Sequence, residues 1–466
     1  MKKIKLLIPI TIQFAVRYVL RTGLLDKIME YAQPVIVIAW EDQSLQKELT
    51  DHGVETFLLP RKHVGIHYAR LLAQLRHWHL RCINTPTTSI DQRRNLLLTP
   101  SNMKARTLLR DSLFQFITMF PPYVRYLLER QKTLVWHDTN LSEYLELIKK
   151  IMPDAVFCLT PYFTEEEFLL RAAQELGVPL CTAILSFDNL TTRPYIPVSF
   201  EKYLLWNKYN EAELRRIYPE SACKPVEVVG APQFDFYYDE SYLWDEAAWR
   251  KKLGLPASQP VLLFGSTGKI IAPHEEQWLY HLDKAIERGQ IMGNPIILLR
   301  CHPNDPIEYW QPLINNTRHI VFCDPWIPGG DVPGKTNITR YDIEKLASTL
   351  FHCIVHINAS STMTIDGAIY DRPQIGPAYD ENGKFANVAR DLYLREHYLP
   401  ITNSGGLDIV YSRHELILAI NTAIRDPHLG MSGRQKIVKE ICTFADGKCT
   451  DRVNLALHNF IKEKVP

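Results

Sequence analysis

Two clusters of polar residues in the second half of this chain have the composition of a phosphate-binding site. They are Arg300-Cys301-His302-Pro303-Asn304 and Asn358-Ala359-Ser360-Ser361-Thr362. Each follows an apolar run, residues 295–299 and 353–357, that is typical of a buried parallel strand. Ligands of open α/β sheets bind at the carboxyl ends of strands. We therefore expect the two clusters to lie on neighbouring strands and to close around one nucleoside diphosphate.

The second cluster opens a predicted helix over residues 363–370, whose first amide groups have no intrahelical partner and attract anions. Asp366 lies near the start of this helix, where it can bind ribose hydroxyls or stabilise the helix dipole. His302 precedes a proline, which favours an extended backbone and leaves the imidazole free to donate to a phosphate. Arg300 can bind the same phosphate or pair with a local carboxylate.

A third polar segment, Gly265-Ser266-Thr267-Gly268-Lys269, follows the apolar run 261–264. Its glycines allow close approach of the backbone, and its hydroxyls could meet a phosphate, although the segment could also be a simple turn. It lacks the spacing of a Walker loop. No G-x-G-x-x-G motif is found, which argues against a dinucleotide redox cofactor. We expect no cofactor beyond a nucleotide-activated substrate.

In the first half, Ser186-Phe187-Asp188-Asn189-Leu190 follows another apolar run, 180–185. Asp188 is the first candidate for a base that activates an acceptor, with Asn189 beside it, although an Asp-Asn pair also forms ordinary turns. Asp138 is the second candidate. Arg17 and Arg21, in the first predicted helix, could orient an anionic acceptor.

The overall charge is nearly balanced, with 53 Lys and Arg against 52 Asp and Glu, and does not indicate a nucleic-acid partner. Locally, residues 61–132 hold 13 basic residues against three acids, together with several aromatic residues in a helical pattern. Such a segment is either a solvated helical face or a contact with an anionic membrane. No apolar run is long enough to span a bilayer.

The nine cysteines are scattered without C-x-x-C spacing, which is typical of reduced, buried thiols in a cytoplasmic protein. His63 and His67 stand one helical turn apart, but no acidic residue completes a zinc-like set. We therefore expect no metal site.

Strand-like and helix-like segments alternate along the chain, which predicts parallel sheets flanked by helices. We expect a domain over residues 1–235 that binds the acceptor, a linker over 236–259 and a donor-binding domain over 260–445. A closing helix over 446–466 should pack apolar residues at 453, 455, 457, 460 and 461.

At these residues the chain resembles the donor half of GT-B glycosyltransferases. The motifs are R-x-H-P-N, N-A-S-S-T-M-T-I-D-G-A, D-R-P and F-A-D-G-K-x-x-x-R. They are most similar to CDP-glycerol glycerophosphotransferases and to transferases like UDP-N-acetylglucosamine 2-epimerase that build bacterial surface polysaccharides. The segments S-F-D-N-L-T-T and V-V-G-A-P-Q-F-D resemble surface-carbohydrate transferases of the same superfamily. The resemblance covers residues 150–460.

The resemblance implies an α/β fold of GT-B type, with two Rossmann-like, doubly wound domains facing across a cleft and a C-terminal helix crossing back. It also implies that His302 and the Ser360-Ser361-Thr362 segment hold the donor diphosphate. Asp366 would contact the ribose, and Asp446, Gly447 and Arg452 would lie near the donor. The chain has R-C-H-P and N-A-S-S where polyol-phosphate transferases have R-P-H-P and D-Y-S-S, so sugar transfer is favoured over glycerol phosphate transfer.

The sequence therefore predicts a metal-independent enzyme that transfers a sugar from a nucleotide-activated donor to a bacterial cell-surface glycan or its lipid-linked precursor. It would work in the cytoplasm, at the inner face of the membrane. Three alternatives stay open: a CDP-glycerol or CDP-ribitol phosphotransferase of teichoic-acid type, a sugar-nucleotide 2-epimerase, and a non-enzymatic scaffold that binds nucleotide sugars.

Overall fold

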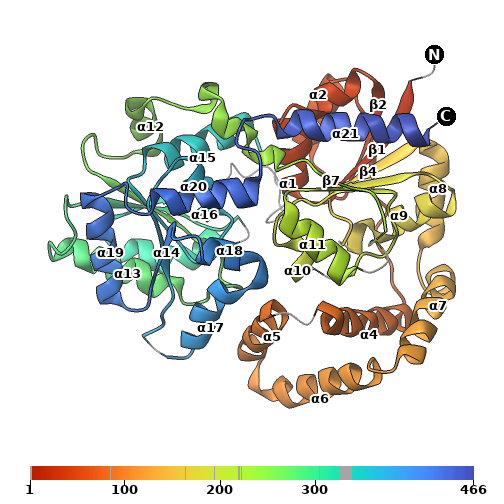
Figure 1. Ribbon diagram of the computed structural model, residues 1–466, viewed down its shortest axis with the longest axis horizontal. Helices are drawn as coiled ribbons and strands as arrows, with labels where there is room; N and C mark the ends of the chain where they lie inside the picture. The colour runs from red at the N-terminus through yellow and green to blue at the C-terminus, as the bar shows by residue number, and fades with distance from the viewer. Residues whose placement is uncertain are drawn as a thin grey trace. The chain divides into compact units, whose positions relative to one another are not determined.

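The computed structural model describes residues 3–83, 86–162, 164–193, 195–218, 221, 223–303, 305–324, 338–381 and 383–465. Asn304, part of the first polar cluster, lies outside these residues. The chain divides into two units, unit 1 (Met1–Gly230 and Thr450–Pro466) and unit 2 (Ala231–Cys449) (Figure 1). Each unit contains one parallel sheet flanked by helices, as the alternating pattern predicts.

Unit 1 has a parallel sheet in the order β3-β2-β1-β4-β5-β6-β7. The strands are β1 (Ile4–Ile10), β2 (Ala32–Ile38), β3 (Glu55–Leu58), β4 (Ala155–Cys158), β5 (Leu180–Ala183), β6 (Lys202–Leu205) and β7 (Val226–Val228). The helices are α1 (Gln13–Val16), the π-helix η1 (Arg17–Arg21), α2 (Leu24–Met29), α3 (Gln43–Asp51), α4 (Ile66–Ile83), α5 (Pro86–Leu98), α6 (Ser101–Ile117), α7 (Pro121–His137), α8 (Leu141–Ile151), α9 (Thr164–Glu175), α10 (Asn189–Thr192), α11 (Lys208–Ile217) and α21 (Cys449–Lys464).

The sheet of unit 1 has an apolar core on each face. Successive side chains of a strand point to opposite faces, and in this sheet both sets are mostly apolar. Leu6 and Ile8 of β1 belong to one core, whereas Leu7 belongs to the other. Helix α21 completes the first core with Val453, Ala456, Leu457, Phe460 and Ile461. This confirms the predicted return of the C-terminal helix, except that Leu455 is 59% exposed and does not pack as expected.

Unit 2 has a parallel sheet in the order β10-β9-β8-β11-β12-β13. The strands are β8 (Val261–Gly265), β9 (Ile296–Arg300), β10 (Ile320–Cys323), β11 (Val355–Asn358), β12 (Gln374–Pro377) and β13 (Leu407–Val410). The helices are η3 (Pro232–Tyr238), η4 (Glu240–Tyr242), α12 (Glu246–Leu253), α13 (Glu275–Glu287), α14 (Ile307–Asn315), α15 (Arg340–His352), α16 (Met363–Ile369), α17 (Ala386–Asp391), η5 (Leu392–Leu394), η6 (Glu396–Tyr398), α18 (Leu399–Thr402), α19 (Arg413–Arg425), α20 (Met431–Ile437) and η7 (Val438–Cys442).

The strand order of unit 2 corrects one expectation. The two strands that carry the polar clusters, β9 and β11, are not neighbours, because β8 lies between them and pairs with both. The order of the sheet reverses at β8 and β11, and such a switch point is where open α/β sheets bind ligands. The segment expected as a linker contains η4 and α12, and Trp249 of α12 is buried in a core with residues of β8 and β9.

Candidate functional site

The loop after β8 is held in place by a buried carboxylate. Ser266 Oγ donates to Glu275 Oε2 at 2.8 Å and Thr267 N donates to Glu275 Oε1 at 2.7 Å. Thr267 Oγ1 donates to the carbonyl of Ala359 at 2.5 Å, across to the loop after β11. Both hydroxyls are therefore used inside the protein, and a contact with a phosphate requires that these bonds be exchanged.

Two glycines let the neighbouring loops approach the β8 loop closely. A Cβ on Gly265 would lie 2.8 Å from Met363 Sδ, at the start of α16. Gly268 has φ +98°, and a Cβ there would lie 3.1 Å from Cγ of His302. A side chain at Gly265 would displace the end of Met363, and one at Gly268 would push against His302 and strain the backbone.

Arg300 and His302 lie at the end of β9, beside this loop. Ser266 N donates to the carbonyl of Arg300 at 2.9 Å, and the Arg300 side chain is buried. Burial lowers the pKa of His302 below its ordinary value because desolvation disfavours the imidazolium, although Asp305 partly opposes the shift. At neutral pH His302 is therefore a neutral hydrogen-bond donor until an anion binds beside it.

The loop after β11 is organised by Asn358, which is fully buried. Its Oδ1 accepts from Ser361 N at 3.2 Å and from Thr364 Oγ1 at 2.8 Å, whereas its Nδ2 is buried without a hydrogen-bond partner. Ser360 has φ +50°, unusual for serine, and donates to the carbonyl of Leu392 at 2.8 Å. The Asn358 amide thus keeps a buried N–H donor with no partner among the described residues.

The three loops are joined at one edge of the sheet. Gly265 pairs in register with Arg300 on one side and with Asn358 on the other. Thr362 is exposed at the start of α16, and Ser361 is half-buried, with Oγ accepting from Met363 N at 3.3 Å. The structure therefore brings together the predicted residues at 265–267, 300, 302, 358 and 360–362.

The other predicted donor residues lie deeper or belong to other segments. Asp366 is buried, and its Oδ1 accepts from Tyr237 OH at 2.6 Å. Asp446 Oδ1 accepts from Lys448 N at 3.1 Å, and Gly447 has φ +67°, where an added Cβ would lie 3.1 Å from Cβ of Tyr238. Arg452 lies in α21, within unit 1, so its approach to a donor stays a prediction.

In unit 1, Asp188 sits immediately before α10 in a polar turn. Ser186 Oγ and Asn189 Nδ2 donate to its Oδ1, and Thr192 Oγ1 donates to its Oδ2 at 3.3 Å. Asn189 is buried and accepts a hydrogen bond from Tyr162 OH. The half-buried Asp188 carboxylate is therefore fixed in orientation by its own loop, which suits either a turn or a base.

The remaining acceptor candidates have structural partners. Asp138 Oδ2 accepts from Tyr68 N at 2.6 Å, in the first turn of α4, and its carbonyl accepts from Gly65 N at 2.7 Å. Arg21 forms a two-pronged ion pair with Glu48, in which Nη2 lies 2.8 Å from Oε2. Arg17 is buried in η1. These contacts link segments far apart in sequence and were not predicted.

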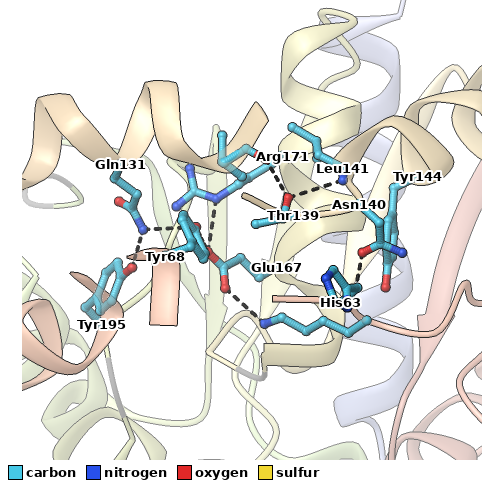
Figure 2. Close-up of polar contacts among 12 residues, drawn as sticks. His63, Tyr68, Gln131, Thr139, Asn140, Leu141, Tyr144, Glu167, Arg171 and Tyr195 are labelled. Atoms are coloured by element: carbon cyan, nitrogen blue, oxygen red, sulfur yellow. Dashed lines mark hydrogen bonds and ion pairs between the residues drawn. The ribbon is translucent and has the colours of Figure 1, made fainter. Parts of the chain in front are cut away.

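A buried network near α9 was also missed. Figure 2 shows Glu167 between Tyr68, whose OH donates to Oε1 at 2.5 Å, and Arg171, whose Nε donates to Oε1 at 3.2 Å. Lys62 Nζ lies 3.3 Å from Oε2. Gln131 bridges Tyr68 and Tyr195. The sequence signal was only the acidic run at the start of α9, which is usual for any helix.

Next to this network, unit 1 contains a partly open cavity of about 1270 Å³, lined by residues of α4, α5 and α6 and by Tyr162, Glu167, Tyr195 and Pro197. It is larger than the roughly 300–1,000 Å³ of most small-molecule sites. Most of the lining residues belong to the basic segment 61–132, whose helical pattern is observed as α4 to α7.

Within the described ranges, no group of three or more His, Cys, Asp or Glu side chains could hold a metal ion. The same residues include no helix that is long and apolar enough to cross a membrane.

No protein-family model matches this sequence, and no curated protein sequence matches it significantly. Solved structures do match. UDP-GlcNAc 2-epimerase from Neisseria meningitidis, bound to UDP-GlcNAc, is 11% identical, with a TM-score of 0.57 over 98% of this chain and 100% of that one. MnaA from S. aureus, in a structure with UDP, is 11% identical, with a TM-score of 0.55 over 99% and 98%. The 2-epimerase from Rickettsia bellii is 11% identical, with a TM-score of 0.52 over 99% of each chain.

At this level of identity the likeness establishes the fold. The two parallel sheets and the structures that match them give the chain the two-domain α/β architecture of GT-B type that the sequence motifs predicted.

Proposed function

We propose that the protein is a glycosyltransferase that moves a sugar from a nucleotide-activated donor to a cell-surface glycan or a lipid-linked precursor. The observation that supports this most is the meeting of three polar loops at the switch point of unit 2. There His302 and the buried Nδ2 of Asn358 are hydrogen-bond donors suited to a diphosphate. Solved proteins of the same fold bind UDP or UDP-GlcNAc, which agrees with a nucleotide-sugar donor.

The proposed reaction is a displacement at the anomeric carbon of the donor sugar. Asp188 takes the proton of an acceptor hydroxyl, whose oxygen forms the new bond to carbon. The bond to the diphosphate breaks, and its electron pair leaves with the diphosphate oxygen. His302 and the donors of the β11 loop stabilise that charge without a metal ion.

The test of this assignment is His302→Ala. Loss of one donor aimed at a developing charge lowers turnover by about a hundredfold or more. The variant should remain folded, and His428→Ala, at an exposed histidine of the same unit, should keep full activity. Near-normal turnover in His302→Ala would remove His302 from the site.

The donor is best identified by a thermal-shift panel of UDP-, GDP-, CMP- and CDP-linked compounds, because a ligand that binds only the folded state raises the melting temperature. Stabilisation by CDP-glycerol or CDP-ribitol alone would favour the polyol-phosphate transferase. If none of these compounds stabilises the protein, the nucleotide-sugar assignment fails.

A sugar-nucleotide 2-epimerase is the second candidate, because several solved structures of this fold are UDP-GlcNAc 2-epimerases. Such an enzyme acts on the donor alone and needs no acceptor, whereas unit 1 contains a large cavity close to the Asp188 loop. Incubation with UDP-N-acetylglucosamine alone, followed by analysis for the 2-epimer, distinguishes the two. A non-enzymatic scaffold would be favoured if Asp188→Asn and Asp138→Asn both left the activity of its assembly unchanged.

We also propose that the enzyme works in the cytoplasm at the inner face of the membrane. The support is the excess of basic residues over residues 61–132. Flotation with anionic liposomes at low salt tests this, and failure to bind would make the segment an ordinary solvated surface.

A further inference from the structure

The helix α6 is apolar on two opposite sides. Met103, Leu108 and Phe114 line the cavity that α6 forms with α4 and α5, whereas Leu109, Leu113 and Phe116 are not among the residues that line it. These three outer residues are 74%, 56% and 59% exposed, and no residue of α6 is buried. They are spaced four and three residues apart, so they form one stripe along the helix.

An exposed stripe of this size on a soluble unit marks an interaction surface. Helix α6 carries three cationic residues, Lys104, Arg106 and Arg110, against one acid, Asp111. An apolar stripe on a basic helix is typical of a helix that lies in the interface of an anionic membrane. The exposed stripe on α6 therefore indicates that a ligand of the adjacent cavity comes from a membrane.

The cavity itself is apolar in part and cationic in part. Leu72, Leu80 and Leu96 lie on its walls together with the guanidinium groups of Arg76, Arg93 and Arg110. The lining also holds two carboxylates. Asp111 pairs with Arg110 at 2.9 Å, and Glu167 pairs with Lys62 at 3.3 Å and with Arg171 at 3.2 Å. Three arginines against two carboxylates give the lining a net charge of +1.

The cavity also adjoins the loop that carries the proposed base. Tyr162 lines the cavity and donates a hydrogen bond to Asn189, the residue after Asp188. Helix α5, which forms one wall, contacts α10, which begins at Asn189. A molecule held in the cavity thus lies one side chain away from the Asp188 turn.

We propose that this cavity binds the hydrocarbon chain of a long-chain amphiphile with an anionic head group, supplied by the membrane on which α6 lies. The apolar walls take the chain, and the arginines bind the head group. On the proposed function, this amphiphile is the carrier part of the sugar acceptor, which makes the acceptor lipid-linked. The binding site is defined by unit 1 alone and does not depend on the donor.

The test uses dodecyl phosphate below its micelle concentration, with binding to the full-length protein measured by equilibrium dialysis. Saturable binding is expected. Dodecyltrimethylammonium, which has the same chain and a cationic head, and inorganic phosphate, which has no chain, should bind at least about tenfold more weakly. Equal binding of the cationic amphiphile would overturn the proposed class of ligand.

Two neighbouring residues of α6 provide matched variants. Leu108→Glu places a carboxylate at the cavity wall, whereas Leu109→Glu makes the same change on the outer stripe, with the same effect on helix propensity. Leu108→Glu should weaken dodecyl phosphate binding by about tenfold or more, and Leu109→Glu should leave it within about twofold. Equal effects of the two variants would refute the site.

A second variant tests the site independently, in case Leu108→Glu loses binding because it misfolds. Ala73→Trp fills the cavity from α4 without adding charge and should also abolish binding. Vesicle flotation separates the two sources of the ligand, because Leu109→Glu should reduce binding to anionic vesicles while keeping affinity for free dodecyl phosphate. If dodecyl phosphate binds as expected but no sugar nucleotide stabilises the protein, the glycosyltransferase assignment fails and the amphiphile site stands.

Discussion

Glu275 makes the stability of unit 2 dependent on pH. Its side chain is 1% exposed, and burial raises its pKa to about 7, although the hydrogen bonds from Thr267 and Ser266 oppose the shift. An acid whose pKa is higher in the folded state than in the unfolded state stabilises the fold only while it is protonated. Its contribution is complete at low pH and is lost as the pH rises from the unfolded value of 4.5 through 7.

The size of the effect follows from the shift. Between pH 5 and pH 8 the wild type should lose about 2–3 kcal/mol of unfolding free energy through this one group. Glu275→Gln resembles the protonated acid, can still accept from Thr267 N, and does not ionise. The stability advantage of the variant over the wild type should therefore grow by about 2–3 kcal/mol between pH 5 and pH 8.

The assay is urea unfolding of both proteins at pH 5, 6, 7 and 8, followed by a signal from unit 2. Glu276→Gln is the control, because Glu276 neighbours Glu275 and its side chain hydrogen-bonds with Tyr309. Its stability should follow that of the wild type at every pH. If the unfolding free energies of Glu275→Gln and the wild type differed by the same amount at every pH, the reasoning would be refuted. Such a result would mean that the pKa of Glu275 does not change from 4.5 to about 7 on folding.

Two further substitutions test the candidate sites. Gly268→Ala should weaken donor binding by displacing the ring of His302, which a Cβ would approach to 3.1 Å, whereas Gly254→Ala, also at positive φ but in open space, should cost about 1 kcal/mol of stability and leave donor binding unchanged. A thermal-shift titration with the best donor measures both, and equal donor affinity in the two variants would contradict the close packing. Arg21→Met should destabilise the protein by about 1–3 kcal/mol because the Glu48 carboxylate loses its partner, and adding Glu48→Gln should restore most of that loss in urea unfolding. If activity stays low in the stable double variant, Arg21 also binds the acceptor; an unchanged stability of Arg21→Met would contradict the ion pair.

The strands were predictable where a short stretch of the sequence is mostly apolar. The predicted runs 295–299 and 353–357 are mostly apolar, and they fall within one or two residues of the bounds of β9 and β11. Strand β13 was missed because Leu407–Val410 carries an aspartate in a run of four, too weak a pattern to recognise.

Pairing and burial were not predictable. The position of β8 between β9 and β11 depends on the face of the sheet over which each connecting helix passes. The residues of the strands themselves do not indicate it. The role of Asp138 at the start of α4 depends on Tyr68, 70 residues away. Glu275 looks like an ordinary acid in the first turn of a helix, and only the packing of the β8 loop around it gives it an unusual pKa.

Unit 1 is built from two stretches of chain separated by the whole of unit 2. During synthesis, residues 1–230 leave the ribosome first, yet the face of their sheet that receives Val453, Leu457 and Phe460 stays uncovered until α21 is made. Unit 2 is continuous and can finish folding earlier. The nascent N-terminal half therefore exposes an apolar surface while unit 2 is synthesised, and a chaperone that shields it should raise the yield of active protein more than one acting on unit 2.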